Sequence, residues 1–278
     1  MSQKIRAKKP PVGAAGAAYF VILGVYACFC VGSSVYFFTV HQVRNGVMSL
    51  LFILIAGVIE LASVLFCVRT RPVFIAGVLL IAVGCILGTC YDFYTKLPVF
   101  DVILHGLSGV VFACCGFALM QVFIGEPTSL KGYIACILFG FAFSMMIAVL
   151  WELFEYMSTA LLGLDMQEDS IIHGFGSYFL AGRHNEIVIV DGIVKTVIYY
   201  GDGQTLVIDG YLDIGLYDTL GDMLVCFIGG ILFLAAFAID RAAGGKLRRA
   251  LILPPAKKFA ACAAAEGGSE LAAGESGS

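Results

Sequence analysis

Charged residues are scarce in this chain. Asp, Glu, Lys and Arg make up 13% of its 278 residues, about half their share of a soluble domain. The formal net charge is −3, so the chain lacks the basic surface that would hold a nucleic-acid backbone. With 60% hydrophobic residues and a mean hydropathy of +0.95, the composition excludes a soluble domain and a disordered chain. It predicts an all-α polytopic membrane protein whose principal partner is the lipid bilayer, with no nucleic-acid partner.

Cysteine is too sparse for a disulfide scaffold, because the chain has ten cysteines in 278 residues. No two of them form a Cys-x-x-Cys motif. Nine fall in long apolar stretches, where a cysteine behaves as a small hydrophobic residue. We therefore expect the cysteines to act as small hydrophobic packing residues, and the outward loop, which contains none, to lack disulfides.

Long apolar runs dominate the rest of the chain. A helix needs about 20 apolar residues to cross about 30 Å of hydrocarbon, and six stretches meet that requirement. They are residues 17–40, 47–68, 73–91, 102–124, 132–162 and 216–239. The first run is longer than the apolar core of a signal peptide, so we expect an uncleaved anchor.

Basic residues predict the orientation of the six helices. Of the 17 Lys and Arg residues, 13 fall on the side that carries both termini. We therefore expect both termini in the cytoplasm and the protein in the inner membrane of a bacterium. The predicted organisation is a cytoplasmic N-terminus, five transmembrane helices, an outward loop, a sixth helix and a basic segment with a disordered tail, at residues 1–16, 17–162, 163–215, 216–239 and 240–278.

The outward loop contains three β-branched runs, at residues 186–190, 193–200 and 204–208. Asp191-Gly192 separates the first two runs and Gly201-Asp202-Gly203 the last two, and such Gly-containing pairs favour tight hairpin turns. The pattern predicts a small antiparallel β-meander on the outer face. The alternative is a mobile loop with one hairpin and no role of its own.

Ionisable residues in transmembrane helices are costly and usually mark function. Three pairs of them, spaced three or four residues apart, fall at one depth near the outer boundary of three predicted helices. The pairs are Asp101 with His105, Glu152 with Glu155, and Asp218 with Asp222. Residues at these spacings share one helical face, so we expect the three pairs to form one site.

Five carboxylates and one imidazole at one depth need neutralisation, because no Lys or Arg lies near them in these helices. Bound cations, protons or wide separation would each supply it. A divalent metal fits the ligand types: oxygen ligands suit Mg, Mn or Ca, and the histidine leaves Zn or Fe open. The alternative is unrelated charges at helix ends. That explanation suits aspartates at N-terminal ends, but not Glu152 and Glu155 at a C-terminal end.

The order of these motifs is similar to that of known membrane families. Trp-Glu-x-x-Glu at 151–155 precedes Asp-Met-Gln at 165–167 and Gly-x-x-Asp-Thr-x-x-Asp at 215–222. With Asp-x-x-x-His at 101–105, the chain resembles the YjdF-like bacterial membrane proteins over roughly residues 50–235. More distantly it resembles the VanZ-like membrane proteins. The resemblance implies an integral inner-membrane protein of a family without a settled biochemical role, and it supplies no substrate.

Three functions compete for this site. In a metal-dependent hydrolase or transferase, Asp101, His105, Glu152, Asp218 and Asp222 would be metal ligands, and Glu155 would be the general base. An amphiphilic small molecule of the cell envelope would be its substrate. In a cation- or proton-coupled transporter the acids would bind the coupling ion, with Glu60 as the one deeper carboxyl group. In a structural or sensory protein they would join helix ends while the outward loop binds a ligand.

Overall fold

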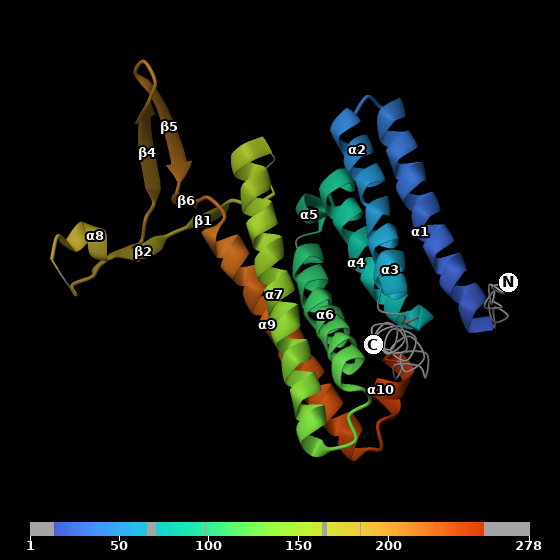
Figure 1. Cartoon of the computed structure of the whole chain (residues 1–278). Coiled ribbons are helices and arrows are strands. Elements are labelled where there is room, and N and C mark those ends of the chain that lie inside the picture. The colour runs from blue at the N-terminus through green and yellow to red at the C-terminus, as the bar shows by residue number, and fades with distance from the viewer. Residues whose placement is uncertain (1–13, 66–70, 98, 163–165, 184, 253–278) are drawn as a thin grey trace, which may run out of the picture. The chain divides into compact units, whose positions relative to one another are not determined.

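The computed structural model describes residues 14–65, 71–97, 99–162, 166–183 and 185–252 (Figure 1). Its helices are α1 (Ala14–Thr39), α2 (Val43–Leu51), α3 (Ile53–Leu65), α4 (Pro72–Tyr91), α5 (Phe93–Lys96), α6 (Phe100–Ile124), α7 (Leu130–Leu162), α8 (Tyr178–Ala181), α9 (Leu216–Ala242) and α10 (Lys246–Leu251). Its strands are β1 (Ser170–Ile172), β2 (Gly174–Ser177), β3 (Val188–Asp191), β4 (Lys195–Tyr200), β5 (Gln204–Asp209) and β6 (Tyr211–Asp213).

Six helical segments are long and apolar enough to cross a membrane, which confirms the expected fold class. They are Ala17–Thr39, Val43–Leu61, Pro72–Tyr91, Phe100–Ile124, Leu130–Leu161 and Leu216–Ala242. The second segment starts earlier than predicted and is divided at Phe52 between α2 and α3. There the Ile55 N–H bonds the carbonyl of Phe52, three residues back, which tightens the turn. The expected disordered tail at 259–278 lies outside the described residues, as does most of the N-terminal segment.

The chain divides into two compact units. The helical unit comprises the described parts of Met1–Ile147 and Val225–Ser278, and the strand unit comprises Ala148–Leu224. The helical unit therefore contains α1 to α6, the first half of α7, most of α9, and α10. The strand unit contains the end of α7, all six strands, α8 and the first turns of α9.

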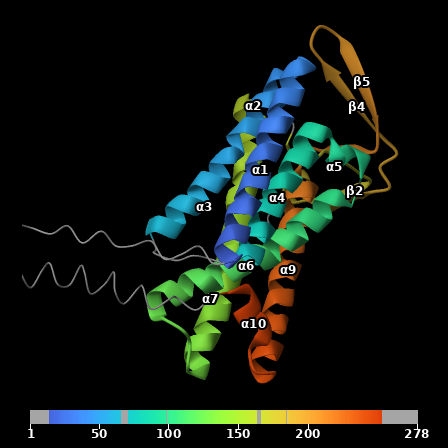
Figure 2. The same cartoon turned by 90° about the vertical axis from the view of Figure 1, so that its right-hand side faces the viewer.

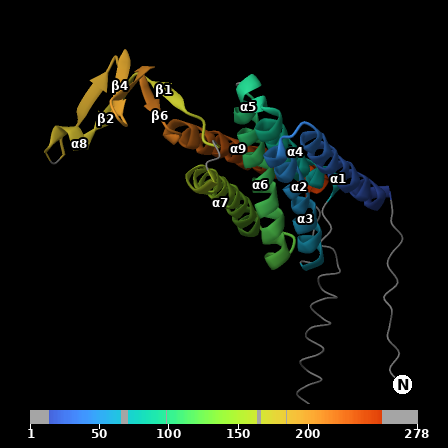
Figure 3. The ribbon, with the colours of Figure 1, turned by 90° about the horizontal axis from the view of Figure 1, so that it is seen from above.

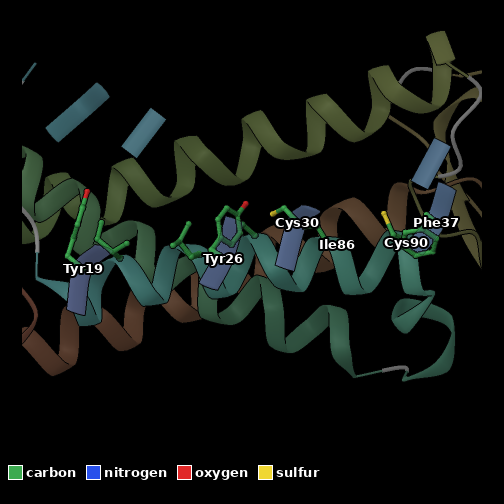
Figure 4. Close-up of a cluster of buried hydrophobic side chains, with 9 residues drawn as sticks. Tyr19, Tyr26, Cys30, Phe37, Ile86 and Cys90 are labelled. Atoms are coloured by element: carbon green, nitrogen blue, oxygen red, sulfur yellow. The ribbon is translucent and has the colours of Figure 1, made fainter. Parts of the chain in front are cut away.

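One hydrophobic core of the helical unit lies between α1 and α4. Figures 2 and 3 show α1 running beside both α2 and α4. Buried side chains along one face of α1, including Tyr26 and Cys30, meet Ile86 and Cys90 of α4 (Figure 4). The Tyr26 hydroxyl donates to the Phe52 carbonyl at 2.6 Å. That hydrogen bond satisfies a buried hydroxyl and ties α1 to the break between α2 and α3.

A second core joins α6, α7 and α9 through Phe117, Tyr133, Phe233 and Phe237. Outside the aromatic residues these helices approach through glycine. A Cβ atom added to Gly109 of α6 would overlap the carbonyl oxygen of Cys226 on α9, and one added to Gly229 would overlap the carbonyl oxygen of Gly106. Small residues permit such backbone contact between membrane helices, where dispersion replaces the hydrophobic effect as the attraction.

The strand unit contains three two-stranded antiparallel ladders, β1–β6, β2–β3 and β4–β5. The hairpin between β4 and β5 turns at 201–203, as predicted, with Lys195 opposite Asp209. At Asp191-Gly192 the pairing differs from the expected hairpin, because β3 pairs with β2 and not with β4. The sequence of β2, Gly-Phe-Gly-Ser, has little β-propensity, so its strand depends on the partner.

The glycine contacts between α6 and α9 predict a selective loss of stability. Gly109→Ala or Gly229→Ala forces the two backbones apart, and we expect each to cost roughly 1–3 kcal/mol, the usual range for overpacking. Thermal unfolding of the purified protein in detergent measures this. The control is Gly24→Ala on α1, where no described atom lies within 4 Å of the added Cβ. Equal melting temperatures for all three variants would contradict the close approach.

Candidate metal centre

Asp101 and His105 form the first half of the centre, on α6. Asp101 lies in the first turn of the helix, where the helix dipole favours a carboxylate. One turn later, His105 Nε2 lies 3.4 Å from Asp101 Oδ1. The side chains are 8% exposed for His105 and 21% for Asp101, so the pair lies largely within the protein.

Helix α9 contacts the other side of the His105 ring. Cys226 Sγ lies 3.8 Å from His105 Nδ1, and its thiol donates to the His105 carbonyl oxygen at 3.3 Å. Ser108 Oγ also donates to that carbonyl and lies 3.4 Å from Cys226 Sγ. The ring therefore has Nδ1 toward α9 and Nε2 toward Asp101. Cys226, expected to act as simple packing, also helps to position this histidine.

Asp222 precedes Cys226 by one turn on α9 and is buried, with 6% of its surface exposed. Asp101, His105 and Asp222 each offer a ligand atom, and these three atoms all lie within 4.8 Å of one another. We call these residues the Asp–His–Asp group. Ligands bound about 2.0–2.6 Å from one cation are separated by distances of this order. The structure thus brings together both residues of the Asp101–His105 pair and one residue, Asp222, of the Asp218–Asp222 pair.

Glu152 and Glu155 are buried on α7, at 5% and 6% exposure, and neither belongs to the Asp–His–Asp group. The Trp151 indole N–H donates to Glu155 Oε1 at 2.8 Å. Trp151 therefore orients a carboxylate, a role beyond the membrane-interface position that its residue type indicates. The ligand role of Glu152 and the base role of Glu155 stay predictions.

Asp218, the remaining predicted ligand, binds the backbone of the loop within the strand unit. The Glu168 N–H donates to Asp218 Oδ2 at 3.0 Å, and Gln167 Nε2 donates to Thr219 Oγ1 at 2.8 Å. A Cβ atom at Gly215 would lie 2.7 Å from Gln167 Cβ, and the backbone there has φ +95°. Glycine at 215 is therefore needed both for its conformation and for the space that Gln167 occupies.

These contacts join two of the sequence motifs in space. The Asp-Met-Gln segment and the Gly-x-x-Asp-Thr segment lie about 50 residues apart in sequence, yet their side chains bind each other. The antiparallel pairing of β1 with β6 brings them together, with Ser170 opposite Asp213. Gln167 and Thr219 belong to the motifs that carry the family resemblance, but composition and spacing gave them no role in the structure.

Comparison with protein families finds a match over residues 18–243 to a family described as predicted membrane proteins, DUF2238. The chain belongs to this family. The YjdF-like resemblance is consistent with that membership, and the matched DUF2238 region contains the Asp–His–Asp group together with Glu152, Glu155 and Asp218. No curated protein and no solved structure matches the chain.

The contact of Asp218 with the loop predicts a local change in hydrogen exchange. Asp218→Ala removes the acceptor of the Glu168 N–H, and losing about 1 kcal/mol of hydrogen bonding raises exchange about fivefold. Hydrogen-exchange mass spectrometry of the peptide that covers residues 166–170 measures this. Asp202→Ala, in the exposed β4–β5 turn, is the control. Unchanged exchange in Asp218→Ala would contradict the contact.

Proposed function

We propose that the Asp–His–Asp group binds a divalent cation and that the protein is a membrane-embedded, metal-dependent hydrolase or transferase. The supporting observation is the convergence of three ligand-bearing side chains within 4.8 Å at the start of two apolar helices. Two carboxylates and an imidazole accept Mg, Mn, Ca or Zn. Three protein ligands leave coordination positions for water or substrate.

The charge balance of the two helices supports a bound cation. Helix α6 contains no Lys or Arg, and the only basic residue of α9 is Arg241 in its last turn. Burial makes an ionised carboxylate costly unless opposite charge or hydrogen bonds offset it. A divalent cation would neutralise Asp101 and Asp222 and, when bound, would polarise an ester or phosphoryl oxygen and activate water.

Other residues would complete the reaction site. We propose Glu155 as general base, since the Trp151 N–H holds its carboxylate in one orientation. Glu152 and Asp218 are proposed as further ligands for the cation. On α7 next to these acids, Leu153 and Phe154 are exposed, which favours contact with lipid. A substrate with an apolar tail and a polar head, drawn from the cell envelope, fits these surroundings.

The proposed setting is the inner membrane of a bacterium, with the Asp–His–Asp group facing outward. It depends on the bias of Lys and Arg toward the side of the termini, because cytoplasmic loops carry the excess of basic residues. If the six segments cross the membrane in turn and the termini lie inside, helices α6 and α9 would both begin at the outer boundary.

A structural role is the second candidate function. His105 is already held by Asp101, Ser108 and Cys226, and the glycines of α6 and α9 bring the two backbones together around it. In this case a cation would fasten α6 to α9 and no reaction would follow. Loss of the metal distinguishes the two candidates. It would abolish turnover if the protein is an enzyme, and it would lower stability if the metal has a structural role.

Metal analysis tests the proposed centre. The purified wild type, dialysed against Mg, Mn, Ca or Zn, should keep about one equivalent of a divalent metal. His105→Ala and Asp222→Asn should each weaken binding by at least about 100-fold, more than changes in outer partners of metal ligands. Asp92→Asn, an exposed carboxylate ion-paired with Lys96, is the matched control. Glu152→Gln and Asp218→Asn show whether the ligand set extends beyond three residues.

The proposal fails if the wild type keeps no stoichiometric metal, or if His105→Ala keeps as much as the wild type. Uptake of sodium or protons into vesicles without bound metal would favour a transporter.

Glu155→Gln separates catalysis from metal binding. Gln still accepts the Trp151 N–H, but it cannot accept a proton, so turnover should fall roughly 10²–10⁴-fold while metal content is unchanged. Release of phosphate from phosphatidic acid, and of fatty acid from phosphatidylglycerol, in mixed micelles are the assays. A metal-loaded wild type that releases neither product, and that melts at a lower temperature once the metal is removed, would support the structural role instead.

A further inference from the structure

A basic pocket lies in the helical unit, where α9 ends and α10 begins. It has a volume of about 300 Å³ and is lined by Pro127, Tyr133, Arg241, Gly244, Gly245, Arg248 and Arg249. Three arginines thus surround one small cavity in a chain with only 17 basic residues. The predicted metal centre uses none of these residues, so the pocket needs a separate explanation.

The turn between α9 and α10 places the arginines. Gly244 and Gly245 have φ +90° and +71°, values that favour glycine and reverse the chain sharply. Buried Asp240 then accepts hydrogen bonds from the N–H groups of Leu247 and Arg248, at 2.7 and 2.9 Å. The Asp240 carboxylate is therefore committed to holding α10 against the end of α9.

The arginine side chains are held in different ways. The Arg241 guanidinium lies 4.6 Å from the centre of the Tyr133 ring, and Tyr133 itself donates to the Phe237 carbonyl. Arg248, whose side chain is 12% exposed, forms an ion pair with Glu126 at 2.8 Å. Arg249 is exposed, and the described residues show no ion pair for it. Two carboxylates, Glu126 and the buried Asp240, stand against three guanidinium groups, so the pocket keeps a net positive charge.

The pocket lies at the ends of membrane-spanning segments. Helix α6 ends at Ile124, α7 begins at Leu130 and α9 ends at Ala242, so residues 125–129 and 243–252 lie at one boundary of the hydrocarbon. Lipid phosphates occupy that depth. Guanidinium groups bind phosphate through paired, charge-assisted hydrogen bonds, and basic pockets at helix ends recognise anionic headgroups.

We propose that the Arg241, Arg248 and Arg249 pocket binds a phosphate group, and that the headgroup of an anionic phospholipid supplies it. The pocket binds this lipid at the opposite end of α9 from Asp222. A zwitterionic headgroup binds more weakly, because its cation meets three arginines. A soluble phosphate compound is the competing source, and it would bind without a membrane.

Native mass spectrometry of the detergent-solubilised protein tests the proposal, with phosphatidylglycerol and phosphatidylcholine as titrants. Arg249→Gln should weaken the tightest phosphatidylglycerol site about fivefold, and Arg241→Gln with Arg249→Gln about 25-fold, at about fivefold for each arginine. Lys131→Gln is the matched control, since Lys131 is exposed at the same boundary but does not line the pocket. Arg249→Lys, which keeps the charge but loses the paired donors, should bind more tightly than Arg249→Gln.

Several results would overturn the proposal. One is a double variant that keeps its melting temperature and binds phosphatidylglycerol as the wild type does. Another is equal weakening by Lys131→Gln, which would reveal a diffuse surface charge. Equal affinity for phosphatidylcholine would also contradict an anionic site. If inorganic phosphate at matched concentration displaces phosphatidylglycerol, the phosphate site stands and the lipid source is wrong.

Discussion

The direct contact between the backbones of α6 and α9 is the constraint on which the candidate centre depends. Gly109 lies against the carbonyl of Cys226, and Gly229 against the carbonyl of Gly106. These contacts lie in the turn of α6 that follows His105 and in the turns of α9 that follow Asp222. A Cβ atom at either glycine would overlap the facing carbonyl oxygen, so the close packing next to His105 depends on the absence of Cβ atoms. Membrane helices depend on such close packing, because the hydrophobic effect does not drive two apolar helices together within lipid.

Much of the helical architecture could be predicted from the sequence, and the reason is physical. A membrane-spanning helix satisfies its backbone internally, so its length and apolar composition are local properties that a sequence displays. The break at Phe52 could not be predicted, since neither Pro nor Gly occurs there. The ladders of the strand unit were harder still. Whether β3 pairs with β2 or with β4 depends on contacts between residues distant in sequence, and Gly-Phe-Gly-Ser gives no local indication of a strand.

The candidate centre shows the same division. The spacing of Asp101 and His105 predicts a shared helical face, and matching depth predicts a partner on another helix; Asp222 meets that expectation. Asp218 has the same spacing relative to Asp222, but its carboxylate accepts the N–H of Glu168. That contact depends on the register of β1 against β6, and the spacing of residues along a helix does not predict a strand register. The ring contact of Cys226 was missed because a cysteine in an apolar run is usually packing.

The distribution of charge along α6, α7 and α9 bears on which function this architecture can support. Asp222 and Arg241 are separated by 19 residues of α9, about 28 Å of helix, with no charged residue between them until Asp240. Helix α6 has none after His105, which lies in its second turn, and α7 has none between Lys131 and Glu152. Buried Gln121, whose amide atoms have no hydrogen-bond partner among the described residues, is uncharged and lies one turn before the end of α6. A route for ions would need polar groups at successive depths, because each desolvated step is costly. Along α6, α7 and α9 the charges are confined to the two ends, which favours the two proposed sites, one near each end, over a route for ions through these helices.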